Sequence, residues 1–328
     1  MLNKELHLNS RFFSGEVEKK STRSGYGDGL LEAAELNKDI VVLTGDLTES
    51  TKVDNFAKKY PERFIEVGIA EQNMAGIAAG LALNGKIPFV SSFASFSPGR
   101  NWEQIRVSVC LSEANVKIVG THSGLSAATD GPTAQALEDL ATMRVLPNLT
   151  LISPIDYNQA VKATTAAAEH KGPVYLRLSR EETKSITTTK TEFEIGDTYT
   201  LSEGDDLSIF VTGPITEQAL IAARNLKVKF NICSDVIAIP TIKPLKAKAL
   251  IESAKKTKKV VTIEEHQIYN GLGSAVAEVL SQHLPTKMLI IGVEDTFCES
   301  GSYSDLINKY GLASHRIEEK IIKFLKGF

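Results

Sequence analysis

The sequence predicts an α/β protein with two domains, each built on a mostly parallel β-sheet. Short runs of β-branched residues alternate with helix-length segments, and nearly continuous apolar strands between helices are typical of parallel sheets covered on both faces. This alternation stops once, in a polar stretch after residue 182, and then begins again. A chain of 328 residues is long for one hydrophobic core, since domains cluster at about 100 to 150 residues. Two cores are therefore expected.

The first domain is predicted over residues 23–182, as a doubly wound, mostly parallel sheet. Residues 1–22 ahead of it are polar and have no helical or strand period, so we expect an arm or a short leading helix there. The strands of this domain are expected in six runs: DIVVLTGD, RFIEVG, IPFVSSF, VKIVGTH, LTLISP and PVYLRLS.

The second domain is predicted over residues 206–328, as a smaller α/β unit. Residues 183–205 before it are rich in Thr, Ser, Glu and Asp and have no helical period, so they are expected to form a linker with at most a short hairpin. The strands of the second domain are expected in DLSIFVTG, FNICSDVIAI, KKVVTIEE and KMLIIGV, and its helices over TEQALIAARNL, KAKALIESAKK and GSAVAEVLSQHL.

Composition excludes several classes of protein. Formal net charge is -3, with acidic and basic residues interleaved, so the chain lacks the basic footprint of a nucleic-acid-binding protein. Cys110, Cys233 and Cys298 lie far apart with no CxxC pair, which argues against a disulfide framework or a zinc site. The N-terminal residues lack the apolar segment of a signal peptide, and the most apolar helix, AEQNMAGIAAGLAL, is too short to cross a bilayer. We therefore expect a cytoplasmic protein.

Candidate site residues follow the predicted strands of the first domain. Ligands of parallel sheets sit outside the carboxyl ends of the strands, where loops meet the first turns of helices. The residues that directly follow these strands are Asp46, Glu71, Phe93, Phe96, His122 and Arg180.

Glu71 opens a helix that carries small residues on one side. A carboxylate in a first helical turn is favoured by the helix dipole, and that is the simple explanation for it. However, Gly76 and Gly80 are four residues apart and permit the close approach of another backbone, as at a subunit or domain interface. Such an interface would desolvate Glu71 and favour its protonated form, as a proton donor and acceptor requires.

Two aromatic rings and a polar loop follow the next strands. Phe93 and Phe96 either belong to the core or stack on a flat heterocycle, which is worth about 0.5 to 1.5 kcal/mol beyond area burial. The loop THSGLSAATDGPTAQ is long and contains His122 and Asp130. Asp130 is explained either by turn chemistry or by a functional role, and His122 by a partly buried position or by catalysis.

Arginines end the last strand of this domain, in YLRLSRE. Strand alternation places Arg177 on one face and Arg180 on the other. An arginine at the carboxyl end of a strand either forms a surface salt bridge or binds a phosphate through its planar fork.

These segments together resemble the carboxyl-terminal half of transketolase, from about residue 20 to the end. The family depends on thiamine diphosphate and also includes deoxyxylulose phosphate synthase and the β subunits of 2-oxo acid dehydrogenases. The resemblance is weaker after residue 200, where it is limited to VVTIEEHQIYNGLGSAVAE and DTFCESGS. Six blocks in family order carry it: TRSGYGDGLLEAAEL, VVLTGDL, FIEVGIAEQNMAGIAAGLAL, PFVSSFASF, GTHSGLSAATDGPTAQALEDLATMRVLPNL and VYLRLSRE.

The resemblance implies that this chain is half of an enzyme. In that family this half supplies a pyrimidine-binding domain and a C-terminal domain, and the preceding half binds the diphosphate and Mg²⁺. A second chain, an N-terminal transketolase subunit with a Gly-Asp-Gly motif, is therefore expected to complete the cofactor site. Because a helix with Gly76 and Gly80 favours pairing about a two-fold axis, we expect an α2β2 assembly.

The resemblance also assigns the cofactor residues. Glu71 matches the glutamate that hydrogen-bonds the pyrimidine ring nitrogen and promotes the imino form of the ring, a positioned proton transfer typically worth about 10²- to 10⁴-fold. Phe93 matches the ring that stacks on the pyrimidine, with Phe96 beside it. Asp46 matches an aspartate near the cofactor.

The substrate residues are assigned in the same way. His122 and Asp130 match residues that contact the hydroxyls of the sugar, and His122 is also expected to take part in catalysis. Arg180 matches an arginine that binds the substrate phosphate. One position departs from the family, since DGPTAQ has Ala134 where transketolases commonly have a histidine that contacts the donor sugar. A related ketose or a different transketolase-like substrate therefore becomes more plausible. The segment SFSPGRNWEQIR differs in length from the family, and no residue is assigned across it.

A Gly-Asp-Gly sequence also occurs in this chain, at residues 27–29, with Asn55 downstream. This spacing is close to that of the magnesium and diphosphate motif. A working motif ends a buried strand, so that its Asp meets the metal and a helix N-terminus meets the diphosphate. Here polar residues precede it and a helix follows, so we interpret the spacing as a coincidence.

The function expected from the sequence is two-carbon ketol transfer from a ketose phosphate to an aldose phosphate, together with the N-terminal subunit. One alternative is a subunit of another thiamine-diphosphate enzyme, similar to deoxyxylulose phosphate synthase or to a 2-oxo acid dehydrogenase β subunit. Another alternative is a non-catalytic chain that binds a partner and has lost its cofactor.

Overall fold

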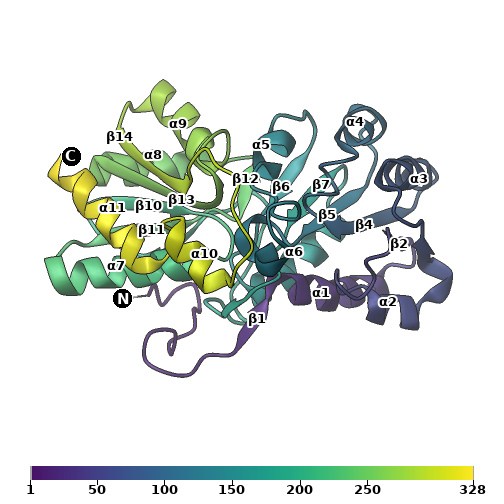
Figure 1. Cartoon of the computed structure of the whole chain (residues 1–328), viewed down its shortest axis with the longest axis horizontal. Helices are drawn as coiled ribbons and strands as arrows, with labels where there is room; N and C mark the ends of the chain where they lie inside the picture. The colour runs from purple at the N-terminus through teal and green to yellow at the C-terminus, as the bar shows by residue number, and fades with distance from the viewer. Residues whose placement is uncertain (1, 328) are drawn as a thin grey trace.

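The computed structural model describes residues 2–327, which form two α/β domains side by side (Figure 1). The first domain contains a seven-stranded sheet with strand order β12-β6-β7-β5-β4-β2-β3. The second contains a five-stranded sheet with order β14-β13-β10-β11-β9. Both sheets are parallel except for one antiparallel edge strand each, β12 and β9. The predicted fold class is confirmed.

All six strands predicted for the first domain are present. The central ones are buried along their whole length, as their unbroken apolar runs predict. The six strands are β2 (Ile40–Thr44), β3 (Phe64–Glu66), β4 (Ile87–Phe93), β5 (Lys117–Thr121), β6 (Thr150–Ile152) and β7 (Val174–Arg177).

Helices cover both faces of this sheet, because successive strand residues point to opposite sides. Ile40 and Val42 pack with α1, α2 and α6, whereas Val41 and Leu43 pack with α3, η2 and α5. The helical segments are α1 (Thr22–Leu36), α2 (Asp54–Lys59), η1 (Pro61–Arg63), α3 (Glu71–Leu83), α4 (Trp102–Gln104), η2 (Ile105–Leu111), η3 (Gly124–Asp130), α5 (Asp139–Arg144) and α6 (Tyr157–Glu169).

The Gly-Asp-Gly sequence lies inside helix α1, which begins at Thr22 before the first strand of the sheet. Its glycines permit close packing: a Cβ on Gly29 would lie 2.5 Å from the carbonyl oxygen of Val161 in α6, and one on Gly27 would lie 2.6 Å from that of Lys52. Asn55 lies in α2 and not after a strand. The prediction that these residues do not form a strand-end motif is confirmed.

The second domain is also a doubly wound sheet, with α7 and α11 on one face and α8 and α9 on the other. Its strands are β9 (Tyr199–Ser202), β10 (Leu207–Val211), β11 (Ser234–Ala238), β13 (Lys259–Gln267) and β14 (Lys287–Val293). Its helices are α7 (Thr216–Phe230), α8 (Ala247–Thr257), α9 (Leu272–His283), α10 (Tyr303–Lys309) and α11 (Ser314–Lys326).

Three strand pairings were not predicted from the sequence, and one of them connects the domains. β12 (Thr241–Lys243) leaves the second domain and pairs antiparallel with β6 of the first sheet. β9 forms the edge of the second sheet, so the expectation of a linker with at most a hairpin is wrong for this stretch. β8 (Glu182–Lys184) pairs with β1 (Lys19–Ser21) at the end of the N-terminal arm.

The N-terminal arm runs along the second domain before it reaches β1 (Figure 1). Leu2 bridges to Ser202 at the edge of the second sheet, and Phe12 is buried among side chains of that domain. The arm therefore packs on the second domain, although it leads into the first. No helix within residues 2–327 has both the length and the apolar character required to span a membrane.

The close packing of α1 on α6 predicts that a methyl group added at Gly29 destabilises the fold. Gly29→Ala places a Cβ 2.5 Å from the Val161 carbonyl oxygen and 3.0 Å from the Thr164 Cβ, so the helices must move apart. Overpacking of this kind is expected to lower the free energy of unfolding by about 1 to 3 kcal/mol. Urea denaturation of the isolated chain measures this decrease in the free energy of unfolding.

The matched control for this substitution is Gly80→Ala in α3, where nothing lies within 4 Å of the added Cβ. This variant should raise the free energy of unfolding by about 0.5 to 1 kcal/mol, because alanine is the better helix former. Equal effects of the two substitutions would contradict the packing argument.

Candidate functional site

Glu71 lies at the first position of α3, and its side chain is only 4% exposed. The guanidinium of Arg100, which is half exposed, donates to both carboxylate oxygens at 3.1 and 3.3 Å. Asn101 donates to the Glu71 carbonyl oxygen at 3.1 Å. A pocket of about 380 Å³ opens here, lined by residues 69–73 and Arg100. The carboxylate is therefore buried beside a pocket and held by a side chain that can move away.

Aromatic rings continue from this ion pair toward the end of β5. The Arg100 guanidinium lies 4.3 Å from the centre of the Phe96 ring. Phe96 stacks on Phe93 with ring centres 5.5 Å apart, and Phe93 stacks on the His122 imidazole at 3.6 Å. Both phenylalanine rings are partly exposed, so they are not simple core residues. The structure therefore brings Glu71, Phe93, Phe96 and His122 together.

Hydrogen bonds define the protonation state of His122. Arg23 donates to Nε2 at 3.2 Å, so Nε2 is an acceptor and the ring proton is on Nδ1. Nδ1 then donates to Thr121 Oγ1 at 2.9 Å, and the Thr121 hydroxyl donates to the Ser92 carbonyl oxygen at 3.1 Å. Burial, with the nearby charges of Arg23 and Arg180, lowers the pKa of His122 to about 3. The imidazole is therefore neutral at physiological pH.

Positive charge gathers beside His122. Arg180 pairs with Asp130 at 3.1 Å, and both side chains are about one-third exposed. Arg23 donates to the Ser50 carbonyl oxygen at 2.8 Å, and burial together with the charge of Arg180 lowers its pKa. Because two neighbouring positive charges repel each other, an anion bound between Arg23 and Arg180 would be stabilised.

The segment that runs from the end of β5 through η3 is strained. His122 has φ 56° and Ala128 has φ 49°, values in the left-handed region that residues with a Cβ rarely adopt. Strain of this kind clusters at binding sites, where the surrounding structure holds it in place.

Asp46 is the predicted residue that the structure does not connect to this cluster. It lies exposed after β2 with φ 60°, and its backbone N–H donates to Glu66 Oε1 at 2.7 Å. Within residues 2–327, no hydrogen bond or ion pair of its side chain reaches the other predicted residues.

Arg23 and Arg100 are site residues that the sequence analysis missed. Arg23 is in the first turn of α1. It lies 99 positions before His122 in the sequence and reaches that residue only in the folded protein. Arg100 lies in the segment whose length differs from the family, where no residue was assigned. For Arg23, its place in the matching block TRSGYGDG was an available signal.

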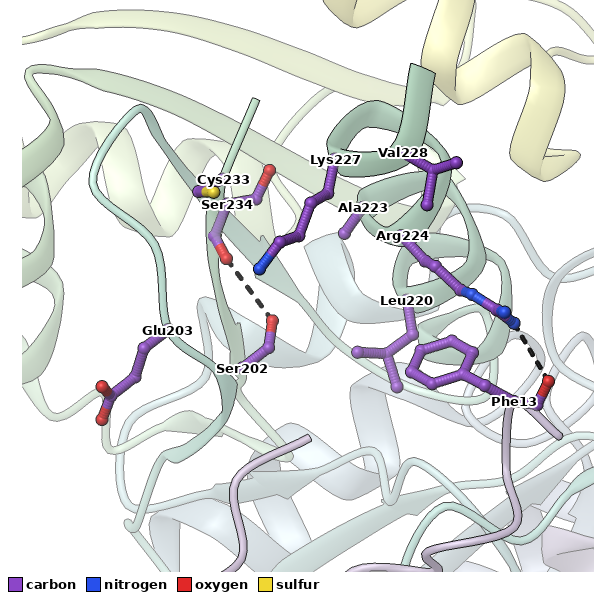
Figure 2. A pocket seen from close by; sticks show the side chains of 10 residues that line it. All are labelled: Phe13, Ser202, Glu203, Leu220, Ala223, Arg224, Lys227, Val228, Cys233 and Ser234. Atoms are coloured by element: carbon purple, nitrogen blue, oxygen red, sulfur yellow. Dashed lines mark hydrogen bonds between the residues drawn. The ribbon is translucent and has the colours of Figure 1, made fainter. Parts of the chain in front are cut away.

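A second pocket, of about 300 Å³, lies in the second domain and away from every predicted site residue (Figure 2). It is mostly apolar and closes against the N-terminal arm. Its lining residues are Phe13, Ser202, Glu203, Leu220, Ala223, Arg224, Lys227, Val228, Cys233 and Ser234. Since the buried carboxylate, the stacked rings and the paired arginines all lie in the first domain, we place the candidate site there. No group of three or more His, Cys, Asp or Glu side chains that could hold a metal ion is found in residues 2–327.

Known proteins share both the sequence and the fold of this chain. Residues 18–185 match the family described as "Transketolase, pyrimidine binding domain", and residues 196–317 match "Transketolase, C-terminal domain". A protein of Methanocaldococcus jannaschii described as a transketolase C-terminal section is 44% identical over 311 residues, which cover 94% of this chain and 97% of that protein.

Two further relatives cover nearly the whole chain. The 6-deoxy-6-sulfo-D-fructose transketolase subunit SqwH of Clostridium sp. is 39% identical over 305 residues, which cover 93% of this chain and 94% of that protein. A solved structure described as "Split gene transketolase, inactive beta4 tetramer" is 45% identical and superposes with a TM-score of 0.87. That match covers 93% of this chain and 98% of the other.

The hydrogen bonds of His122 predict that its ring does not titrate near neutrality. NMR signals of the ring should stay unchanged between pH 8 and pH 5, because the pKa in the folded chain is about 3. Histidines in the urea-unfolded chain, which titrate near about 6.5, are the reference. A midpoint for His122 between pH 5 and pH 8 would contradict the neutral Nδ1–H assignment.

The same shift predicts how stability changes with pH. The unfolded chain takes up this proton below about pH 6.5, whereas the folded chain takes it up only below about pH 3. The free energy of unfolding should therefore fall as the pH drops through that window, and it should fall less steeply in His122→Gln.

Proposed function

Because the chain belongs to the transketolase family, as its sequence predicted, we propose that it is the C-terminal subunit of a split, thiamine-diphosphate-dependent transketolase of the cytoplasm. With an N-terminal subunit it transfers a two-carbon ketol unit from a ketose phosphate to an aldose phosphate. The observation that carries this proposal is the arrangement of a buried carboxylate, stacked aromatic rings and paired arginines at one edge of the first sheet. The relatives described as a C-terminal section and as a subunit support it.

The residues present fit the pyrimidine of the cofactor. Glu71 offers a buried carboxylate at an open pocket, and Phe93 and Phe96 offer partly exposed ring faces beside it. In the free chain the N–H donor to Glu71 is Arg100. In the assembled enzyme Glu71 would instead share a proton with the pyrimidine ring nitrogen, and Arg100, which is half exposed, would turn away from the carboxylate. When bound, thiamine diphosphate supplies the carbanion chemistry that ketol transfer requires.

We propose that the partner chain holds the diphosphate and Mg²⁺. The Gly-Asp-Gly sequence of this chain is unsuitable for that role, because its glycines pack against Lys52 and Val161 inside a helix. A diphosphate needs free N–H groups at a loop or a helix N-terminus, and α1 has already bonded these groups or buried them. We therefore assign the diphosphate site to the proposed N-terminal subunit.

The arginines and His122 support a phosphorylated sugar as substrate. Arg180 and Arg23 would bind the phosphate, and Asp130, which now holds Arg180, would accept from a sugar hydroxyl. Neutral His122 has an acceptor Nε2, which Arg23 now occupies and which a second hydroxyl would take when Arg23 turns to the phosphate. A bare 2-oxo acid such as pyruvate has no sugar hydroxyls to engage Asp130 and His122, so the alternative of a 2-oxo acid dehydrogenase subunit is less well supported.

Ala134 does not indicate which sugar is the donor. Its side chain is a buried methyl group and offers no hydrogen bond to a substrate. SqwH is described as a subunit of a transketolase for a sulfo-sugar. We therefore include ketoses with an anionic group other than phosphate among the candidate donors.

The exposed face of α3 supports assembly with other chains. Gly76 and Gly80 have open space in front of them, and Ile69 and Leu83 at the two ends of the helix are 71% and 68% exposed. Leu111 on the neighbouring η2 is 73% exposed. Apolar side chains around a strip of glycines favour a close helix pair, and we propose that this face forms the central contact of an α2β2 assembly.

Replacement of the buried carboxylate tests the mechanism. Glu71→Gln in the complex with the N-terminal subunit should lower kcat for ketol transfer by about 10²- to 10⁴-fold, because the amide is a poor proton acceptor. Coupled assays with sugar phosphates and with pyruvate measure both activity and substrate class. Glu169→Gln, at an exposed position of α6, is the control and should be fully active. If Glu71→Gln catalysed ketol transfer within a few-fold of the normal rate, the assignment of Glu71 to proton transfer would be wrong.

A larger side chain on the exposed face of α3 tests the proposed assembly. Gly76→Leu should fold normally as an isolated chain, because nothing lies within 4 Å of the added Cβ, but should fail to form the full α2β2 assembly in a mixture with the partner subunit. Lys255→Leu, an exposed position of α8, is the matched control. Sedimentation velocity of both mixtures is the measurement, and normal assembly of Gly76→Leu would show that another face forms the contact.

A further inference from the structure

The second domain has its ligand crevice at the junction with the first domain. In its sheet the strand order reverses between β10 and β13, and in open α/β sheets ligands bind outside the carboxyl ends of strands at such a point. Here the first domain fills that place. Gly213, after β10, lies against Ser153, where an added Cβ would be 2.9 Å from the Ser153 Oγ. Glu265, near the end of β13, meets the loop η3.

Glu265 is fixed by three contacts, two to η3 and one to α10. Its Oε1 accepts the backbone N–H of Ser126 at 3.0 Å, and its Oε2 accepts the Tyr303 hydroxyl at 2.7 Å. Gly124 packs so closely that an added Cβ would lie 2.6 Å from Oε1. Glu265 is buried, which raises its pKa to about 7. A buried carboxylate with two donors is a strong and specific contact.

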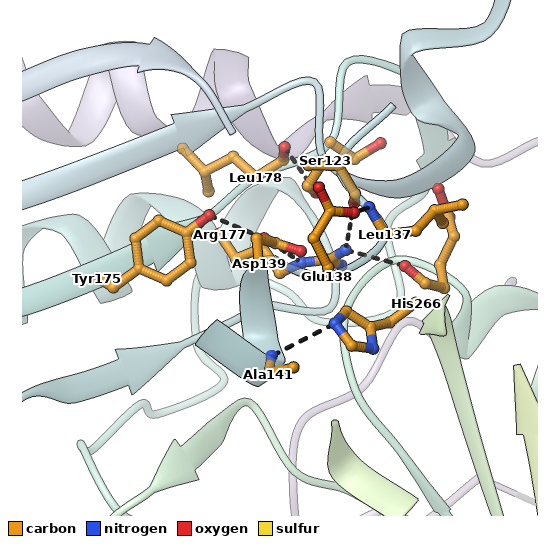
Figure 3. A network of polar contacts seen from close by, with 12 residues as sticks. Ser123, Leu137, Glu138, Asp139, Ala141, Tyr175, Arg177, Leu178 and His266 are labelled. Atoms are coloured by element: carbon orange, nitrogen blue, oxygen red, sulfur yellow. Dashed lines mark hydrogen bonds and ion pairs between the residues drawn. The ribbon is translucent and has the colours of Figure 1, made fainter. Parts of the chain in front are cut away.

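The backbone on either side of Glu265 is held as well. Its carbonyl oxygen accepts from Arg177 at 2.9 Å, and Arg177 also pairs with Asp139 at 2.7 Å. Figure 3 shows this network, with Arg177 between Asp139 and the strand that carries His266. The Glu265 carboxylate is therefore presented from a rigid base.

From Ser126 the contacts lead directly to the substrate residues. The Ser126 hydroxyl donates to the Ser123 carbonyl oxygen at 2.6 Å and accepts the backbone N–H of Arg180 at 3.1 Å. Arg180 in turn pairs with Asp130 at the end of η3. One carboxylate of the second domain is thus two hydrogen bonds away from the proposed phosphate arginine.

We propose that Glu265 is a positioning residue, which holds η3 in its strained conformation and thereby places Arg180 and Asp130 to bind the anionic sugar. Its effect on the loop is a property of this chain alone. Its effect on substrate binding rests on the proposed function. The second domain then serves the active site by binding a loop of the first domain where a related fold would bind a ligand.

Glu264 provides a matched control from the adjacent position. It is buried to the same degree, and burial also raises its pKa to about 7. Its carboxylate accepts the N–H groups of Leu272 and Gly273 at 2.7 and 2.8 Å, which are at the start of α9. Loss of Glu264 therefore affects α9, whereas loss of Glu265 affects η3.

Hydrogen–deuterium exchange of the isolated chain at pH 8 tests the effect on the loop. Glu265→Leu removes both acceptors and should speed the exchange of residues 122–131 by about 10- to 100-fold, the loss expected for a hydrogen bond to a charged group. Glu265→Gln keeps an acceptor for the Ser126 N–H and should stay within a few-fold of the wild type. Glu264→Leu should speed the exchange at the start of α9 and leave 122–131 unchanged. Wild-type exchange of the loop in Glu265→Leu, or equal acceleration by Glu264→Leu, would overturn the proposal.

A milder variant covers the case in which Glu265→Leu does not fold. Tyr303→Phe removes only one of the two hydrogen bonds to the carboxylate. It should increase the exchange of residues 122–131 by a smaller factor, and an unchanged rate would equally overturn the proposal.

Kinetics of the complex with the N-terminal subunit test the effect on substrate. Glu265→Leu should raise KM for the phosphorylated sugar about tenfold, which is the loss of about one well-placed hydrogen bond, with kcat within a few-fold. Glu265→Gln should restore KM. If the wild-type complex shows no ketol transfer, the proposed function fails, and the exchange result still decides the role of Glu265. If transfer is normal and KM is unchanged in Glu265→Leu, the positioning of Arg180 is wrong.

Discussion

The buried ion pair between Arg177 and Asp139 is the contact on which the arrangement of the two domains depends. Arg177 ends the central strand β7, Asp139 opens α5, and the two side chains are 3% and 1% exposed. Tyr175 donates to the same carboxylate oxygen, and Arg177 also reaches the Glu265 carbonyl oxygen of the second domain. Because a charge left alone in the interior typically costs about 3 to 5 kcal/mol, neither partner can leave without the other. The first sheet, the helix after η3 and the second sheet are therefore fixed to one another.

The sequence was sufficient to predict the elements that lie within each core. A parallel strand buried on both faces requires an unbroken apolar run, so β2, β5 and β7 were visible in the sequence alone. The short strands β9 and β12 could not be predicted from the sequence. β12 has three residues and pairs with a strand that lies about ninety positions earlier, and β9 lies in a polar stretch. Their pairing is determined by the way in which the domains dock, and no local pattern carries that information.

The same distinction holds for the candidate site. Strand ends of a parallel sheet meet at one edge, so Glu71, Phe93 and His122 could be predicted as neighbours from their positions after strands. The partners of these residues could not be predicted, since Arg23 and Arg100 reach them from other segments. Arg177 was weighed as a surface salt bridge or a phosphate ligand and is instead fully buried. That outcome required knowledge of the second domain, which covers the end of its strand.

The second domain therefore does more than brace the assembly. Its crevice holds η3 through Glu265, and η3 carries Asp130, which in turn holds Arg180. Coupling between two sites is reciprocal, so if η3 binds an anionic sugar more tightly when it is docked, as the proposed function implies, it must also dock more tightly when the sugar is bound. The strain at His122 and Ala128 has the same consequence, because a strained loop persists only while its contacts hold it. Under the proposed function, substrate binding and the docking of η3 on the second domain would be linked in one equilibrium through the Glu265 carboxylate near the end of β13.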